Sequence, residues 1–271
     1  MEYLASGFNN VDNTDDFSRY SNCLNFLHNI EFFKNYKNDI HRMLKLKDSL
    51  NVLDVGCGLG DDLLDIAKEI GPGGIVTGLD SSESLLSVAR VNIENGPKNI
   101  ELVKGDALNL EFDDETFDRC KIDRTLQHIS NPKKALSEMY RVLKPGGIML
   151  AFDNDWETFT FSCTNRALVR KVANYWCDSF TSGWIGRYLY TYFSELGLSD
   201  IEAFPRTLVI SDLEKSDRVF GLFQTINHVL DENLISDKEA SELTNQMRER
   251  DNTNSFFSSY TGFIVLGRKP N

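Results

Sequence analysis

The sequence has no run of about 18 apolar residues, which is the length that a helix needs to cross a bilayer. Residues 1–16 also lack the basic segment followed by an apolar segment that marks a secretion signal. We therefore expect a soluble, cytoplasmic protein. A chain of 271 residues is long enough for one large domain, or for a core domain with an appended cap.

Cysteine and basic clusters are also scarce. The five cysteines form no C-x-x-C pair and no cluster with histidine, so we expect reduced, mostly buried thiols and no metal site. A net charge of −12, without a Lys/Arg cluster interleaved with aromatics, argues against nucleic acid as a partner. A small-molecule partner is expected, with no membrane partner. A monomer and a homodimer both stay open.

The most informative stretch is residues 51–62, NVLDVGCGLGDD. Its apolar residues predict a short buried strand, and Gly56, Gly58 and Gly60 follow at once. An amphipathic run, DDLLDIAKEIG, comes next. Strand, glycine-rich turn and helix in this order are how a doubly wound α/β sheet opens a nucleotide pocket. The glycines let the backbone bend tightly and approach a ligand.

The acids in this stretch indicate which nucleotide. A dinucleotide site has a third glycine where this chain has Asp61, followed by Asp62. Asp54 lies just before the turn. Carboxylates would repel a pyrophosphate, which disfavours a nicotinamide cofactor. A cationic ligand without phosphate fits better, and S-adenosylmethionine (SAM) is such a ligand.

Further acids follow the next two predicted strands. Asp80 ends the strand at 75–79, about 20 residues beyond the glycine turn, where such folds bind the ribose hydroxyls. The alternative is that Asp80 caps the following helix, although Ser81 and Ser82 are equally suited to do so. Asp106, between Gly105 and Ala107, follows the strand at 100–103 and is placed to accept from an adenine amino group. Five βα units in residues 48–152 predict a parallel sheet.

A fourth strand, ending near Asp123, brings more polar residues to the same edge of the sheet. His128 is our candidate general base, because its ordinary pKa suits proton removal near pH 7. A structural hydrogen bond is the competing interpretation for His128. Arg124 is placed to meet the SAM carboxylate or an anionic substrate, a surface ion pair being the alternative, and Gln127 is a candidate substrate contact.

Five motifs together resemble the class I SAM-dependent methyltransferases, in particular the UbiE-like small-molecule branch. They are VLDVGCGLGDD, GLDSSESLL, GDALNLEFDDETFD, DRTLQHI and YRVLKPGG, which lie in order within residues 48–152. The resemblance implies a Rossmann-like, seven-stranded, mostly parallel sheet flanked by helices, with SAM as methyl donor. It implies that Asp54, Gly56 and Gly58 line the methionine end, that Asp80 meets the ribose, and that Asp106 and Ala107 meet the adenine. Further expected cofactor contacts are Cys57, Asp61, Ser81 and Gly105.

The flanking regions predict additions to this sheet. Residues 1–47 are expected to form an N-terminal helical lid, and residues 48–271 the methyltransferase domain. Helical insertions are expected over about 156–192 and, as a cap before the last strand, about 213–252. Tyr20 is a candidate ligand contact from the lid. The predicted acceptor pocket draws on the first insertion, although aromatics there are as compatible with a core: Trp156, Trp184, Arg187 and Tyr188.

These features predict methyl transfer from SAM to an O, N or C atom of a small-molecule acceptor, in a biosynthetic pathway, with S-adenosylhomocysteine (SAH) as product. Two alternatives stay open. One is a methyltransferase for a peptide, RNA or other macromolecule. The other is a protein of this fold that binds SAM and assists cyclisation or rearrangement without methyl transfer. Formation of SAH separates this last alternative from the two methyltransferase interpretations, because only methyl transfer releases SAH.

Overall fold

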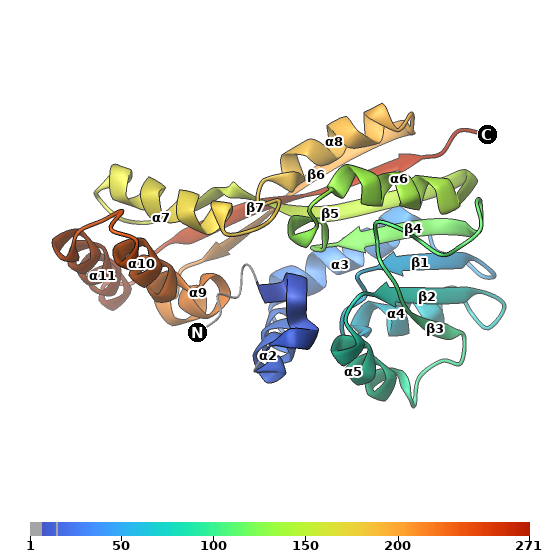
Figure 1. The fold of residues 1–271 in the computed structure, drawn as a ribbon, viewed down its shortest axis with the longest axis horizontal. Helices are drawn as coiled ribbons and strands as arrows, with labels where there is room; N and C mark the ends of the chain where they lie inside the picture. The colour runs from blue at the N-terminus through green and yellow to red at the C-terminus, as the bar shows by residue number, and fades with distance from the viewer. Residues whose placement is uncertain (1–6, 15) are drawn as a thin grey trace.

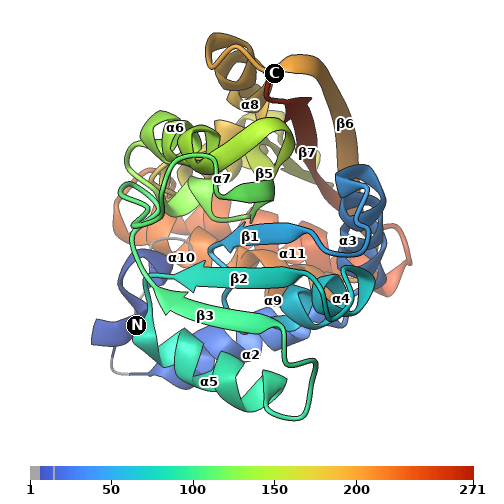
Figure 2. The same ribbon diagram turned by 90° about the vertical axis from the view of Figure 1, so that its right-hand side faces the viewer.

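The computed structural model of the protein describes residues 7–14 and 16–271, apart from the side chain of Asn9. Its centre is a seven-stranded sheet in the order β3-β2-β1-β4-β5-β7-β6 (Figures 1 and 2). The strands are β1 (Asn51–Val55), β2 (Ile75–Asp80), β3 (Ile100–Lys104), β4 (Phe117–Asp123), β5 (Leu143–Phe161), β6 (Ser199–Ile210) and β7 (Ser258–Arg268).

The sheet is mostly parallel, as predicted. β1 pairs in parallel with β2 and β4, and the parallel pairing continues outward to β3 and β5. Only β7 breaks the pattern, because it lies antiparallel between β5 and β6. After β3 the chain returns to the other side of β1, so the strand order reverses between β1 and β4. In such sheets the ligand crevice lies at the carboxyl ends of the strands at this reversal.

Helices cover both faces of the sheet. Because side chains alternate along a strand, neighbouring residues of β1 pack on opposite faces. Val52 packs against α4 (Asp61–Glu69), whereas Leu53 and Val55 pack against α6 (Pro132–Val142) and α8 (Ile185–Glu195). α5 (Glu83–Ile93) follows β2 and packs beside β3. Within the described residues, no helix is long and apolar enough to cross a membrane.

β5 is much longer than predicted. The sequence predicts a strand ending at Phe152 and a helical insertion from residue 156, but β5 pairs with β7 as far as Phe161. The sequence ETFTF explains the difference. Threonine and phenylalanine both favour strands, and their alternation buries Phe159 and Phe161 on one face. Helix α7 (Arg166–Asp178) begins only after this extension.

A helical cap lies between β6 and β7, over the region predicted for it. It consists of α9 (Leu213–Phe220), α10 (Leu222–Asp231) and α11 (Asp237–Asn252), which gather with α7 at the end of the sheet away from the C-terminus (Figure 1). Phe220, Ile226 and Leu243 join one hydrophobic core with β5 and α7. This core is continuous with the sheet.

The described part of the predicted lid contains the 3₁₀ helix η1 (Phe8–Asn13), α2 (Phe17–His28) and α3 (Glu31–Leu44). Residues 1–6 and 15 of the predicted lid lie outside the described residues. α3 packs firmly on the sheet: it buries Phe33, Ile40 and Leu44, and the Tyr36 ring stacks on Phe152 with ring centres 4.2 Å apart.

Asp12 attaches η1 to the start of α5. Its carboxylate accepts hydrogen bonds from Ser82 Oγ (2.5 Å) and from the backbone N–H groups of Glu83 (2.9 Å) and Ser84 (3.0 Å). Burial alone would raise the pKa of Asp12, but these hydrogen bonds outweigh it and lower the pKa to about 2. An ionised carboxylate at a helix N-terminus is stabilised by the helix dipole. An ionised Asp12 therefore ties η1 to the start of α5 at neutral pH.

The docking of α3 gives a first prediction. Ile40 is 1% exposed, so Ile40→Ala should lower the free energy of unfolding by about 2–5 kcal/mol through the cavity it leaves. Urea unfolding measures this. The control Val91→Ala, at a 69% exposed position on α5, should change it by less than about 0.5 kcal/mol. Equal, small effects of the two substitutions would show that α3 does not contribute to the folded core in solution.

Candidate active site

A cavity of about 320 Å³ opens at the carboxyl ends of β1, β2, β3 and β4. This is the strand reversal at which a ligand crevice is expected. The lid contributes one wall through residues such as Leu24, Leu27 and Phe33. α7 and the cap contribute another through Trp176, Val219 and Gln224. The cavity is therefore lined by segments that are far apart in the sequence.

Nearly all of the predicted cofactor residues line this cavity. Those that do are Asp54, Gly56, Cys57, Gly58, Asp61, Asp80, Ser81, Gly105, Asp106, Ala107 and Arg124. Tyr20 is the exception. Its ring is buried in the lid with Val11 and Leu85 and meets Phe8 edge to face, with ring centres 5.0 Å apart. The prediction that Tyr20 contacts the ligand does not hold for this cavity, because its ring is used to pack η1 against α2 and α5.

The glycine loop adopts a backbone that only glycine takes easily. Gly56, Gly58 and Gly60 have φ angles of +74°, +54° and +78°. A Cβ on Gly56 would also lie 2.2 Å from Thr125 Oγ1, at the end of β4. The loop therefore needs glycine at Gly56 both for its conformation and for its close approach to the neighbouring strand.

Asp80 holds this loop and faces the cavity. Its carboxylate accepts from the backbone N–H groups of Gly58 and Ser82, each at 2.9 Å, and burial raises its pKa. The alternative role of helix cap falls to Ser82, whose hydroxyl accepts from Leu85 N–H. A carboxylate has about four acceptor sites. Asp80 thus keeps capacity for ribose hydroxyls after serving both backbone groups.

The predicted adenine end is more open. Asp106 is exposed at the rim of the cavity, and its Oδ1 accepts from the backbone N–H of Leu108 at 2.8 Å. This turn leaves the other carboxylate oxygen available, and Ala107 beside it presents only a methyl group. The geometry is compatible with a ring that lies against Ala107 and donates to Asp106.

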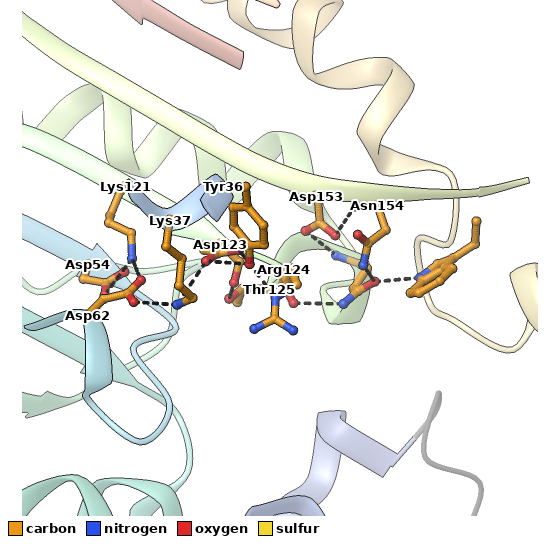
Figure 3. Close-up of polar contacts among 12 residues, drawn as sticks. Tyr36, Lys37, Asp54, Asp62, Lys121, Asp123, Arg124, Thr125, Asp153 and Asn154 are labelled. Atoms are coloured by element: carbon orange, nitrogen blue, oxygen red, sulfur yellow. Dashed lines mark hydrogen bonds and ion pairs between the residues drawn. The ribbon is translucent and has the colours of Figure 1, made fainter. Parts of the chain in front are cut away.

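A network of six alternating charges, which we call the ion network, crosses the floor of the cavity (Figure 3). Lys121 is its centre: Nζ lies 3.0 Å from Asp54 and 2.6 Å from Asp62. Lys37 of α3 pairs with Asp62 at 2.5 Å and with Asp123 at 3.5 Å. The members are Lys37, Asp54, Asp62, Lys121, Asp123 and Arg124.

Burial and pairing set the ionisation of this network. Burial raises the pKa of Asp54 to about 6, against the opposing effect of Lys121. For Asp62 the two lysines outweigh burial and hold its pKa well below the ordinary value. The carboxylates of Asp54 and Asp62 in turn raise the pKa of Lys121, although its burial acts to lower it. An incoming cationic ligand group near Asp54 would favour its ionised form.

His128 borders the cavity but is a weak base there. Its ring lies between Phe8 and Phe180, with ring centres 5.3 and 5.8 Å away. Burial and the charge of Arg124 lower its pKa to about 3. Since a general base works best with a pKa near the working pH, this environment disfavours the predicted catalytic role. A neutral imidazole can still exchange hydrogen bonds with a ligand.

Of the predicted substrate contacts, Gln127 and Trp156 line the cavity. Gln127 is largely committed to structure, because its Oε1 accepts from Trp156 Nε1 (2.7 Å) and Asn154 Nδ2 (3.1 Å), while its Nε2 donates to the backbone carbonyl of Arg124 (3.0 Å). The Trp156 ring stacks against Phe180, with ring centres 5.0 Å apart. Trp156 therefore contributes apolar wall, and Gln127 holds the wall in place.

The other three predicted acceptor contacts lie outside the cavity. α8 turns Ile185 and Leu189 toward the sheet, so Trp184 (50% exposed) and Tyr188, one position earlier in each case, face outward. Arg187 pairs with the carboxylate of Asp155, with two contacts of 2.8 Å. The expectation that Trp184, Arg187 and Tyr188 line the acceptor pocket is therefore corrected.

Several lining residues escaped the sequence analysis. The aromatic wall is completed by Phe33 of α3, Phe180 after α7 and Tyr260 of β7, which no local motif connects. Asn154 also lines the cavity although it is almost fully buried. The sequence does indicate a buried charge pair at Lys121. A lysine inside the predicted strand FDRCKID must pair with an acid if its side chain is buried.

The comparisons with known proteins agree with this geometry. The model of a family described as a methyltransferase domain matches residues 46–197. The chain belongs to the SAM-dependent methyltransferases. SAM is accordingly its cofactor, and the cavity at the glycine loop is the place in the fold where such a nucleotide is expected.

Two relatives of this methyltransferase illustrate the range. An uncharacterized 37.1 kDa protein in transposon TN4556 of Streptomyces fradiae is 34% identical over 190 residues, which cover 70% of this chain and 55% of that protein. Demethylmenaquinone methyltransferase of Listeria welshimeri is 40% identical over 119 residues, which cover 44% of this chain and 50% of that protein. The matches thus span about half the length of these relatives.

Solved structures show the same fold. A putative methyltransferase from Bacillus halodurans superposes with a TM-score of 0.62 at 24% identity and covers 87% of this chain and 99% of that one. A Haemonchus contortus phosphoethanolamine N-methyltransferase, solved with phosphomonomethylethanolamine and SAH, also gives 0.62, at 18% identity, over 97% of this chain and 60% of that one. At these identities the likeness concerns the fold.

A second prediction concerns Asp80. Asp80→Ala should weaken SAM binding by about 10–100-fold, because it removes charge-assisted hydrogen bonds to the loop and to the ribose. Isothermal titration calorimetry with SAM measures the loss. Asp114→Ala, at an exposed acid beyond the cavity, is the control and should bind like the wild type. Wild-type affinity in Asp80→Ala would remove Asp80 from the binding site.

A third prediction follows from the environment of His128. Because its pKa falls from the unfolded value of 6.5 to about 3, the unfolded chain binds more protons between these values. The His128 contribution to stability is therefore full above pH 6.5 and is lost as the pH falls toward 3. Unfolding free energies measured from pH 7 to 4 should decline less steeply in His128→Gln than in the wild type. Identical slopes, or an imidazole NMR titration near pH 6.5, would contradict this environment.

Proposed function

We propose that this methyltransferase transfers the methyl group of SAM to an O, N or C atom of a small-molecule acceptor held against the aromatic wall. The observation that carries the proposal is the single cavity that joins the glycine loop and its acids to that wall. Donor and acceptor can meet there without leaving the protein. The lid and the cap both contribute walls to this cavity, which favours an acceptor small enough to fit between them.

In the donor half, we place the adenine against Ala107 and Asp106 and the ribose at Asp80. The methionine end then lies at Gly56 and Asp54, over the ion network. In this orientation the sulfonium methyl is directed toward the carboxyl end of β4 and the part of β5 around Asn154. A carboxylate at Asp54 suits the ammonium group of the methionine.

In the acceptor half, the chemistry asks mainly for placement. Methyl transfer is an in-line displacement from a donor that SAM has already activated, so aligning the nucleophile and excluding water are the main tasks of the protein. Phe33, Trp156 and Phe180 supply an apolar surface for the body of the acceptor. The low pKa of His128 favours an acceptor whose nucleophile needs no strong base, or loses its proton before transfer.

A fourth prediction tests this function with methyl-labelled SAM, the purified protein and an extract of source cells. The label should appear in the solvent-extractable small molecules, and SAH should form in equal amount. The Asp80→Ala variant is the matched control and should transfer far less label at the same SAM concentration. Mass spectrometry of the labelled fraction would identify the acceptor.

The other outcomes separate the alternatives. Label in the precipitated macromolecules would contradict the small-molecule proposal and favour a peptide or RNA acceptor. SAM binding without label transfer or SAH formation, across extracts from several growth conditions, would favour a role in cyclisation or rearrangement.

A further inference from the structure

Asn154 lines the cavity and carries a hydrogen-bond acceptor that no described residue uses. The orientation of its amide is fixed by its neighbours: Trp156 Nε1 can only donate, so the group of Gln127 that it meets must be Oε1. The group of Asn154 beside that oxygen must then be Nδ2. Its Oδ1 is left buried and without a hydrogen-bond partner among the described residues, although Asn154 is only 2% exposed.

Arg124 presents donors to the same part of the cavity. Its Nε is buried and makes no hydrogen bond in the described part of the chain, and the nearest carboxylate oxygen, on Asp123, lies 3.6 Å away. Asp123 is shared with Tyr36 and Lys37. The guanidinium group lies between the Asp54–Lys121 pair and Asn154 (Figure 3), and its Cζ is 4.7 Å from the centre of the Phe33 ring, which also lines the cavity.

Arg124 and Asn154 lie close together because β4 and β5 are neighbouring strands of the sheet. Arg124 N–H donates to the carbonyl of Phe152 at 2.8 Å, which brings the end of β4 beside the residues that follow Phe152. The Arg124 carbonyl and the Asn154 amide also share Gln127 as a common partner. A buried acceptor without a hydrogen-bond partner destabilises the protein unless a ligand or a water molecule donates to it. An occupant that both accepts and donates hydrogen bonds would satisfy both residues.

We propose that Arg124 and Asn154 form an acceptor subsite for an apolar molecule that carries an anionic oxygen, such as a carboxylate or phenolate, together with a hydroxyl or N–H donor. Arg124 binds the anionic oxygen and Asn154 Oδ1 accepts from the donor. This proposal rests on the proposed function, whose acceptor it narrows. It assigns Arg124 to the acceptor and not to the SAM carboxylate, since Asn154 lies on the far side of Arg124 from Asp54 (Figure 3) and Phe33 of the aromatic wall lies against its guanidinium group.

Matched naphthalene probes test the subsite without turnover, using SAH-saturated protein and equilibrium dialysis. 2-Naphthoate should bind about tenfold or more tightly than neutral 2-naphthamide, and Arg124→Gln should abolish this preference while Arg124→Lys keeps part of it. 6-Hydroxy-2-naphthoate should bind about fivefold more tightly than 2-naphthoate, and Asn154→Leu should remove that gain. Arg90→Gln, on the exposed side of α5, should behave like the wild type.

SAH affinity, measured by calorimetry in the same variants, should stay within about twofold of the wild type, since no charged contact to SAH is lost. A large loss of SAH affinity in Arg124→Gln and Asn154→Leu would overturn the proposal by assigning both residues to the methionine group. Equal affinity for naphthoate and naphthamide in the wild type, or no binding of either, would also overturn it. Because no methyl is transferred in this assay, its outcome is independent of whether the label of the previous experiment reaches a small molecule.

Discussion

The structure depends on keeping Lys121 paired. This lysine lies on the central strand β4, where its side chain is almost completely buried, so its charge must be matched inside the protein. Asp54 of β1 and Asp62 of α4 match it, and Lys37 of α3 then balances Asp62 and reaches Asp123. Breaking a buried pair by removing one partner typically costs about 3–5 kcal/mol. The lid helix α3 is thereby tied by charge as well as by packing to the strands that carry the site.

This constraint also divides the cavity. The carboxylates on the β1 side present negative charge to a cationic donor, whereas the positive charge of Arg124, at the end of the network, lies against Phe33 of the aromatic wall. A sulfonium and an anionic oxygen would each find the complementary end, with the methyl between them. The same arrangement explains the neutral state of His128, because the charge of Arg124 and the surrounding rings both oppose its protonation. The charges of the ion network therefore influence both the binding of donor and acceptor and the protonation state of His128.

The parts of this picture that local sequence controls could be predicted. The glycine loop, Asp80 and Asp106 follow buried strands, and the carboxyl ends of parallel strands necessarily meet at one edge. The acceptor side of the cavity could not be predicted, because it is assembled by packing between distant segments. These segments contribute Phe33 from the lid, Phe180 after α7 and Tyr260 from β7. The prediction placed Trp184 and Tyr188 in the cavity because aromatic residues occur on more than one face of this helical segment. The sequence alone therefore does not indicate which face packs against the sheet. The partners of Lys121 depend on the same long-range packing, although its position in an apolar strand signals that partners exist.

The orientation of SAM in the cavity is the central claim, and the bound methyl group reports on it most directly. With ¹³C-methyl SAM bound to the protein, isotope-filtered nuclear Overhauser effects should connect the methyl to ring protons of the aromatic wall, from Phe33, Phe180 or His128. The adenine protons should contact the methyl group of Ala107. Contacts from the sulfonium methyl to Ala107 instead, or to none of these rings, would contradict the division of the cavity into a donor half and an acceptor half.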